Sequence, residues 1–338
     1  MTSSSPPTLE QVAALAGVSR ATVSRVVNGS PKVSPVVRAQ VERAVAKLGY
    51  VPNRAARSLV TRRADSVALV VSESRARFFS EPFFAGMVRG VSAALTETGV
   101  QLLLLIAQDL PDRRRLQRYV VGGHVDGVLL ASLHGDDPLP GALERAGVPA
   151  VLVGRPTGPA LVSYVDADNR GGAGKAVEHL ARRGHRRIAT ITGPLDMGVG
   201  LDRLDGYRDG LAAAGLAGDE DLVELGDFTE EGGAAAMARL LARPGPPVDA
   251  VFAASDLMAA GALLALRAAG RRVPDDVAVV GFEDSVVARY AQPPLTTVRQ
   301  PIEEMGRQAT RLLLARAAGE PTGMHLILDV ELVVRASA

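Results

Sequence analysis

The chain contains no cysteine and no tryptophan, and only 4% of its 338 residues are aromatic. Without cysteine it can form no disulfide, thiolate nucleophile, zinc–cysteine site or iron–sulfur cluster, which is consistent with a reducing compartment. Long apolar runs are also absent. The longest one, Leu102 to Ala107, falls far short of the roughly 18 residues that a membrane span needs, and it indicates a buried strand.

The N-terminus lacks a basic flank followed by an apolar stretch, so it is unlike a signal or transit peptide, and we expect a cytoplasmic protein. A hydrophobic content of 47% with 22% charged residues excludes global disorder. The length indicates two domains, or one large α/β body with a small appendage. We expect residues 1–7 to be a disordered tail.

Charge is segregated along the chain, although the net charge is only +1. Residues 1–63 hold ten Lys or Arg against two acids, which gives +8, and the remaining 28 basic and 35 acidic residues give −7. A basic segment joined to an acidic body suggests a module for a polyanion.

The basic segment has the pattern of two short helices joined by a glycine turn. Thr8 and Gln11 form a capping box that starts a helix at residue 9, and Gly17 ends that helix. Ser19 can cap a second helix that ends at Asn28, and Ser34 starts a third helix. This order predicts a helix-turn-helix, with an ordinary helical hairpin as the alternative.

The outward face of the second helix carries side chains that can read DNA. Arg can bridge two guanine acceptors, Asn can pair with adenine, and a small Ala leaves room for a thymine methyl. The candidate base-reading residues are Arg20, Ala21, Ser24, Arg25 and Asn28. Phosphate contacts are expected from the capped helix ends at Thr8 and Ser19 and from Thr22, Arg38 and Arg54.

The stretch from Thr8 to Asn28 resembles the DNA-binding headpiece of the lactose and galactose repressor family, and residues 49–59 resemble its hinge. The resemblance implies that Asn53 caps a hinge helix containing Ala56. It also implies that Leu59 is an apolar wedge in the minor groove, where such side chains kink the duplex. The alternative for Leu59 is packing at a domain junction.

The rest of the chain alternates short apolar runs with helical stretches, which is typical of parallel sheets covered by helices on both faces. The expected strands are the runs at 67–71, 101–106, 128–130, 150–153, 188–191, 250–253 and 277–280, with a further β-like run at 326–334. Because about 270 residues exceed one doubly wound sheet, we expect two lobes with a ligand cleft between them. The expected domains are a headpiece and hinge at 8–63 and a core at 64–338. The first lobe is expected at about 65–165 plus 296–325, and the second at about 166–292 plus 326–338.

The family resemblance continues through this body, whose arrangement is similar to periplasmic sugar-binding proteins. It implies that a small-molecule effector, a sugar or sugar derivative, is held in the cleft by aromatic and hydrogen-bonding side chains. The implied contacts are Phe83, Phe84, Arg155, Arg203, Phe228, Ser255, Glu283 and Gln300.

Two of these positions depart from the family pattern, since Ser255 replaces a frequent Asn and Glu283 a usual Asp. The identity of the sugar therefore stays open. Each contact also has an ordinary alternative: Arg203 as a surface ion pair, Phe83 as core, or Glu283 as a solvated loop acid.

No enzyme motif is present in the sequence. Gly171 to Lys175 fails the phosphate-loop spacing, and the five histidines lack metal-ligand spacing, so we expect no catalytic residue, metal or cofactor. The predicted function is a repressor that binds a palindromic operator as a homodimer, without a C-terminal heptad segment to join dimers. The alternatives are an exported solute-binding protein, a sugar-metabolising enzyme with a DNA-binding module, and a regulator whose effector is another protein.

Overall fold

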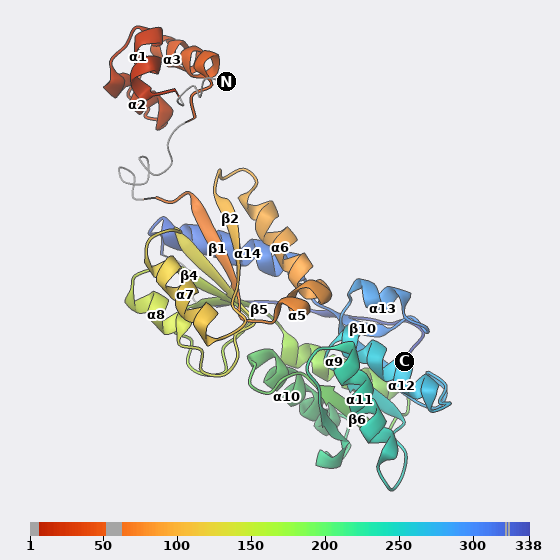
Figure 1. Cartoon of the computed structure of the whole chain (residues 1–338). Coiled ribbons are helices and arrows are strands. Elements are labelled where there is room, and N and C mark those ends of the chain that lie inside the picture. The colour runs from red at the N-terminus through yellow and green to blue at the C-terminus, as the bar shows by residue number, and fades with distance from the viewer. Residues whose placement is uncertain (1–6, 52–62, 322, 324) are drawn as a thin grey trace. The chain divides into compact units, whose positions relative to one another are not determined.

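The computed structural model describes residues 7–51, 63–321, 323 and 325–338. Contacts divide the chain into two compact units, Met1–Ala64 and Asp65–Ala338 (Figure 1). The hinge predictions at Asn53, Arg54, Ala56 and Leu59, and residues 1–6 of the predicted tail, lie outside the described residues.

The first unit is a three-helix headpiece whose helices start at the predicted caps: α1 Leu9–Ala16, α2 Arg20–Val27 and α3 Pro35–Leu48. Gln11 N–H donates to the Thr8 hydroxyl at 3.4 Å, and the Gln11 side chain accepts from Thr8 N–H at 2.9 Å, which completes the capping box. Gly17 ends α1 in the left-handed conformation at φ 65°, where a side chain would be strained. The three helices bury one common core: Val12, Ala13, Val23, Val26, Val41 and Ala44.

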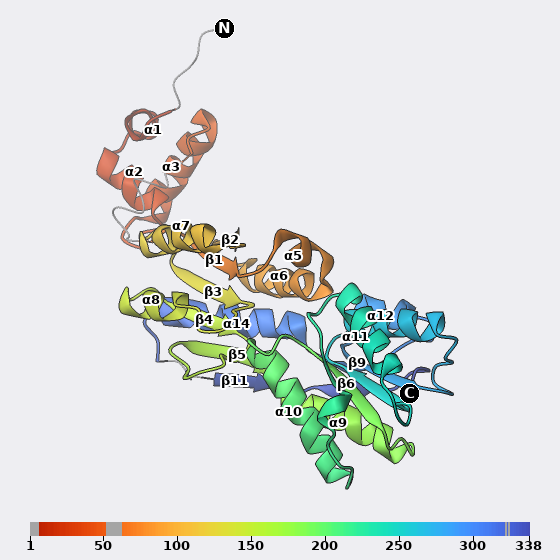
Figure 2. The ribbon, with the colours of Figure 1, turned by 60° about the horizontal axis from the view of Figure 1, so that its bottom comes forward.

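The second unit contains two six-stranded sheets (Figure 2). The first has the order β11-β5-β4-β3-β1-β2 and is parallel throughout. Its strands are β1 Ser66–Val71, β2 Gln101–Ile106, β3 Gly127–Ala131, β4 Ala150–Val153, β5 Ser163–Ala167 and β11 His325–Leu328. The second has the order β12-β10-β9-β8-β6-β7, with only β12 antiparallel among its pairings. Its strands are β6 Ile188–Thr192, β7 Val223–Leu225, β8 Ala250–Ala253, β9 Ala278–Glu283, β10 Thr296–Arg299 and β12 Glu331–Val333.

Helices cover both faces of each sheet, so most strands are apolar nearly throughout. The first lobe has α5 Arg75–Ser80, α6 Pro82–Leu95, α7 Leu110–Val121, α8 Leu139–Arg145 and α14 Ile302–Ala317. The second has α9 Asn169–Arg182, α10 Gly198–Ala213, the 3-10 turn η1 Glu220–Leu222, α11 Glu230–Ala242, α12 Asp256–Ala268 and α13 Val286–Tyr290. In β1, Leu69 belongs to the core shared with α6 and α14, and Val70 to the core shared with α7 and α8.

The structure places the lobe crossings differently from the expected boundaries. Strand β5, which includes Asp166, pairs with β4 and β11 in the first sheet, so the second lobe begins with α9. Strand β10 pairs with β9 in the second sheet, and the return to the first lobe follows it, through α14. The C-terminal apolar run is split, with β11 in the first sheet and β12 in the second. Strand pairing decides these boundaries. Because paired strands can be far apart in the sequence, the order of the motifs does not predict the pairing.

None of the helices in the described ranges is long and apolar enough to cross a membrane. Nor do His, Asp and Glu gather anywhere among these residues in a group of three or more that could hold a metal ion.

Candidate DNA-binding and effector sites

The helix that carries the candidate base-reading residues buries Val23 and Val26 and leaves its polar side chains on the other face. Arg20, Ala21 and Arg25 are exposed. Such a helix, held by its apolar face against α1 and α3, presents its N-terminal end and one row of side chains to a ligand.

Two of the expected phosphate contacts are occupied in capping. The Ser19 hydroxyl accepts from Thr22 N–H at 3.2 Å and lies 2.9 Å from the Thr22 hydroxyl, while Thr8 caps α1. Caps leave other N–H groups of the first turn free, and those groups together with the helix dipole attract phosphate.

Three further headpiece residues already have partners within the headpiece. Arg20 Nε lies 3.0 Å from Glu10 Oε1, in an exposed ion pair that DNA can replace at small cost. Asn28 is half-buried at the end of α2 and donates to the Ser24 hydroxyl at 3.3 Å. Arg38 Nη2 donates to the Ser30 carbonyl at 2.6 Å, which ties α3 to the preceding loop.

The two lobes enclose a small cavity of about 70 Å³, which we call the inner cavity. It lies beyond the carboxyl ends of several strands, where open α/β sheets bind ligands. Residues of both lobes line it: Arg77, Glu81, Phe83, Ser132, Val153, Gly154, Asp166, Met197, Val199, Arg203, Phe228, Glu283, Gln300 and Met305. Five of the eight implied effector contacts are therefore brought together here: Phe83, Arg203, Phe228, Glu283 and Gln300.

Arg203 is the centre of the hydrogen-bonding network around this cavity. Its side chain is 2% exposed, and it donates to Asn169 Oδ1 at 2.9 Å, to the Ala254 carbonyl at 2.5 Å and to Gln300 Oε1 at 3.1 Å. The guanidinium carbon lies 3.7 Å from the centre of the Phe282 ring. Burial lowers the pKa of Arg203 to about 10, which leaves it charged at neutral pH. A guanidinium has five N–H donors, so two of them remain for a ligand.

Phe228 forms the aromatic wall of the cavity. Its backbone has φ 66°, a rare conformation for a residue with a side chain, and its ring covers Gly193 so closely that a Cβ there would lie 2.1 Å from it. The Arg77 guanidinium carbon lies 5.3 Å from the centre of the Phe228 ring. A glycine at 193 is thus required for the aromatic ring to face the cavity.

Glu283, at the end of β9, is the buried acid of the cavity. It has φ 115°, and Asp284 follows at φ 55°; strained backbone of this kind tends to be held at ligand sites. Burial raises the pKa of Glu283 to about 8, although the charge of Arg203 opposes this. Burial also raises the pKa of Asp166 to about 6 and that of Glu81 to about 7. The cavity thus presents two permanent cations, Arg77 and Arg203, among carboxyl groups that can donate or accept hydrogen bonds.

Three of the expected contacts lie outside the lining of the inner cavity. Phe84 is 1% exposed and belongs to the core of the first lobe, against Phe78 and Phe83. Ser255 is 1% exposed, and its hydroxyl caps α12 by accepting from Met258 N–H at 3.2 Å. Arg155 forms an ion pair with Asp202 of the second lobe and lines a neighbouring cavity instead.

Sequence reasoning missed an acid–base chain that reaches the cavity through Arg77 and Glu81. Arg77 lies between Glu73, 2.6 Å from its Nη1, and Glu81, with both acids four residues away. The four-residue spacing of Glu73, Arg77 and Glu81 was visible in the sequence. The approach of Arg77 to Phe228, however, depends on how the two lobes meet.

His134 of the first lobe joins this chain to the second lobe. Its Nε2 lies 3.0 Å from Glu73 Oε1, and its Nδ1 lies 3.0 Å from Asp196 Oδ2. The hydrogen bond to Glu73 raises the pKa of His134, burial opposes this, and Asp196 adds to the rise. Burial would raise the pKa of Glu73, but the hydrogen bond from His134 and the charge of Arg77 outweigh it and hold that pKa below its usual value.

We expect His134→Gln to flatten part of the pH dependence of stability. A histidine with a raised pKa in the folded state contributes stability that is fully present below about pH 6.5 and is lost as pH rises through the raised value. The melting temperature of the unsubstituted protein should therefore fall relative to that of the variant between pH 6 and 9. The matched control is His325→Gln, on edge strand β11. Melting temperatures of the chain and of its His134 variant that change with pH in parallel would contradict the expectation.

The comparisons with known proteins agree with this architecture. Residues 8–53 match the model of "Bacterial regulatory proteins, lacI family", and residues 177–338 match a periplasmic binding protein-like domain. The HTH-type transcriptional regulator CelR of Thermobifida fusca is 59% identical over 334 residues, which cover 98% of each chain.

Two solved structures are similar over nearly the whole length. The structure described as a transcriptional regulator CelR–cellobiose complex superposes with a TM-score of 0.79 at 57% identity, covering 98% of this chain and 100% of that one. The lac repressor dimer bound to operator and the anti-inducer ONPF gives a TM-score of 0.85 at 29% identity, covering 98% and 99%.

A helix-turn-helix headpiece joined to a two-lobed periplasmic-binding-protein-like body defines a class of DNA-binding transcriptional regulators. The chain belongs to the LacI family of bacterial regulatory proteins. It is a regulator and not an enzyme, as are the relatives that it matches.

Proposed function

We propose that the chain represses transcription as a homodimer that binds a palindromic operator and responds to a sugar in the inner cavity. The observation that carries this proposal is that Arg203, Phe228, Glu283 and Gln300 converge from separate elements on one cavity between the lobes. An aromatic wall with a few convergent polar groups suits a pyranose ring, whose faces carry C–H groups and whose edge carries hydroxyls.

The headpiece reads DNA through α2, whose residues at base edges are Arg20, Ala21, Ser24, Arg25 and Asn28. The residues that contact phosphates or position the helix are Thr8, Ser19, Thr22 and Arg38. Asn53, Arg54, Ala56 and Leu59 complete the interface in the hinge, where paired Leu59 side chains act as the minor-groove wedge. Because its target is DNA, the protein acts in the cytoplasm. Residues 8–63 and 64–338 are the two functional domains.

The effector is a glucose disaccharide of the cellobiose type. Support comes from the CelR–cellobiose complex, which is 57% identical in sequence and covers 98% of this chain. Effector binding changes the angle between the lobes and hence the spacing of the two hinges in the dimer. It shifts the equilibrium only by its differential affinity for the two states, commonly about 1–3 kcal/mol.

Dimerisation would cover the exposed edge of the first sheet. Strand β2 is at that edge, reads Gln-Leu-Leu-Leu-Leu-Ile and is at best half-buried along its length, with Leu104 40% exposed. On α5 and α13, Phe79, Val286 and Tyr290 are also exposed. Apolar edges of this kind are covered by a partner in stable proteins.

We expect Leu104→Lys to convert the dimer to a monomer, because it introduces a charge into the apolar edge of β2. Operator affinity should fall by at least about tenfold, since one headpiece alone reaches one half-site. Sedimentation equilibrium measures the change. The matched control is Leu326→Lys, because Leu326 is 38% exposed at the opposite edge of the same sheet. If the Leu104 variant sediments like this control, β2 is not part of the interface.

Selection of bound duplexes from a random DNA pool tests the proposed function. The full chain should enrich an inverted repeat, and cellobiose added during selection should reduce that enrichment. Enrichment of no defined sequence would contradict the operator hypothesis, and enrichment that no sugar alters would favour the alternative of a protein effector.

A further inference from the structure

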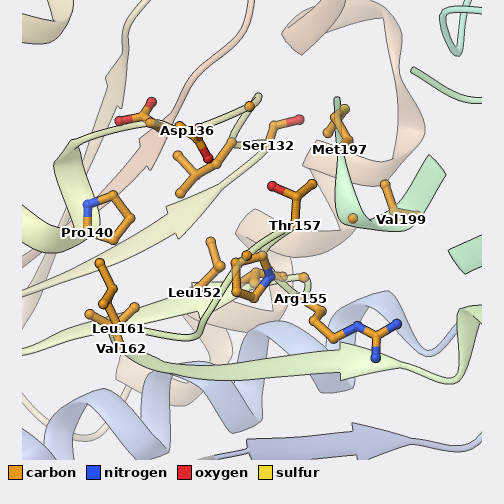
Figure 3. Close-up of a pocket in the computed structure, with 18 of the residues that line it drawn as sticks. Ser132, Asp136, Pro140, Leu152, Arg155, Thr157, Leu161, Val162, Met197 and Val199 are labelled. Atoms are coloured by element: carbon orange, nitrogen blue, oxygen red, sulfur yellow. The ribbon is translucent and has the colours of Figure 1, made fainter. Parts of the chain in front are cut away.

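A second cavity, of about 280 Å³, adjoins the inner cavity, and we call it the outer cavity (Figure 3). Its walls are the segment after β3, at residues 132–140, the connection from β4 to β5, at residues 152–162, and the start of α10, at residues 197–199. Five residues line both cavities: Ser132, Val153, Gly154, Met197 and Val199. The two spaces are therefore neighbours that share one wall, and both lobes contribute to it.

The volume of the inner cavity is too small for the proposed effector. Small-molecule sites usually have volumes of about 300–1,000 Å³, and the inner cavity has only about 70 Å³. With the outer cavity added, the site reaches the lower end of this range. An effector of two rings therefore extends beyond the inner cavity, and the lining of the neighbouring space decides where its second ring lies.

The lining of the outer cavity suits a sugar ring. Leu152, Leu161, Val162 and Pro140 give it an apolar surface, against which the C–H face of a pyranose can pack. Asp136 and Thr157 also line it, are exposed, and make no hydrogen bond or ion pair with the described part of the chain. Figure 3 shows the Arg155 guanidinium directed away from Leu161 and Val162, so its charge does not occupy this space.

We propose that the outer cavity is the subsite for the second ring of a disaccharide effector and that it makes the regulator respond to disaccharides and not to glucose. This rests on the proposed function, in which the first ring lies against Phe228 in the inner cavity. The second ring packs on Leu161 and accepts or donates hydrogen bonds at Thr157 and Asp136. Because Met197 and Val199 come from the second lobe, a ligand that fills both cavities contacts both lobes over a larger area than a monosaccharide does.

Calorimetric titration of the full chain with glucose and with cellobiose tests the subsite in the variant Leu161→Trp. Leu161 is 57% exposed, so the larger side chain is tolerated by the fold while it fills the outer cavity. The expected result is cellobiose affinity at least tenfold weaker, with the weaker glucose affinity unchanged. The matched control is Leu225→Trp, a 61% exposed leucine on β7 that lines neither cavity, which should leave both affinities unchanged.

A second variant, Thr157→Val, removes one hydroxyl without changing the size of the side chain. It should weaken cellobiose binding several-fold and leave glucose binding unchanged, and operator binding by each variant checks the fold. Equal losses for both sugars, or unchanged cellobiose affinity in both variants, would overturn the subsite. If the unsubstituted chain binds neither sugar, the proposed sugar effector fails, and this outcome is distinct from failure of the subsite alone.

Discussion

Arg203→Ala should abolish the response to cellobiose while leaving operator binding intact. The guanidinium is buried between Asn169, the Ala254 carbonyl and Gln300, and two of its donors remain for the sugar. Hydrogen bonds to a charged group contribute about 1.5–3 kcal/mol each, so losing two of them weakens cellobiose binding by about 100-fold or more. Calorimetry measures the affinity, and fluorescence anisotropy with labelled operator measures the response.

The same substitution leaves buried acceptors without a donor, so the melting temperature should fall as well. Arg208→Ala is the matched control, since Arg208 is on the same helix, half-exposed and paired with Glu220 at 3.0 Å. It should preserve the affinity and the response. An Arg203 variant that folds, binds operator and still responds to cellobiose would place the effector elsewhere.

Arg20→Ala should lower affinity for the specific operator by at least about tenfold, because each lost bidentate contact to a base costs about 1–3 kcal/mol. The loss occurs in both headpieces of a dimer. In the free headpiece Arg20 pairs with Glu10 at 3.0 Å, and exposed pairs of this kind contribute little, so the fold should tolerate the change. Anisotropy titrations at fixed salt on operator and on random duplex separate sequence reading from general attraction.

Arg43→Ala, on the exposed side of α3, removes the same charge without removing a predicted base contact. It should weaken binding to both duplexes equally and slightly. If Arg20→Ala also weakened both duplexes to the same degree, Arg20 would be a phosphate contact and not a base-reading residue.

Local features of the fold could be predicted from the sequence because neighbouring residues determine them. Thr8, Ser19 and Ser34 cap the three headpiece helices as expected, and the apolar runs at 101–106, 150–153 and 250–253 form strands β2, β4 and β8 with those bounds. Strand β5 was missed because Ser163 and Asp166 interrupt its apolar character. The lobe boundaries were misplaced because β10 and β11 take their sheets from non-local pairing.

The inner cavity was predictable only in part. Phe228 and Gln300 follow β7 and β10, Glu283 ends β9, and Arg203 lies on α10, so only the family resemblance indicated that they share one site. The approach of Arg77 and Glu81 could not be predicted, because it depends on the packing of α5 against residues of the other lobe. Ser255, one of the implied effector contacts, caps α12 in the structure, a role that the sequence Ser-Asp-Leu-Met already allowed.

The central claim is that a sugar in the cleft controls binding of the headpieces to DNA. Fluorescence anisotropy with the selected operator, at fixed salt and with and without cellobiose, tests it most directly. We predict that saturating cellobiose changes operator affinity by about 5–150-fold, the range of an ordinary allosteric coupling, and leaves random duplex unaffected. Identical operator affinity with and without cellobiose and other sugars would contradict the account.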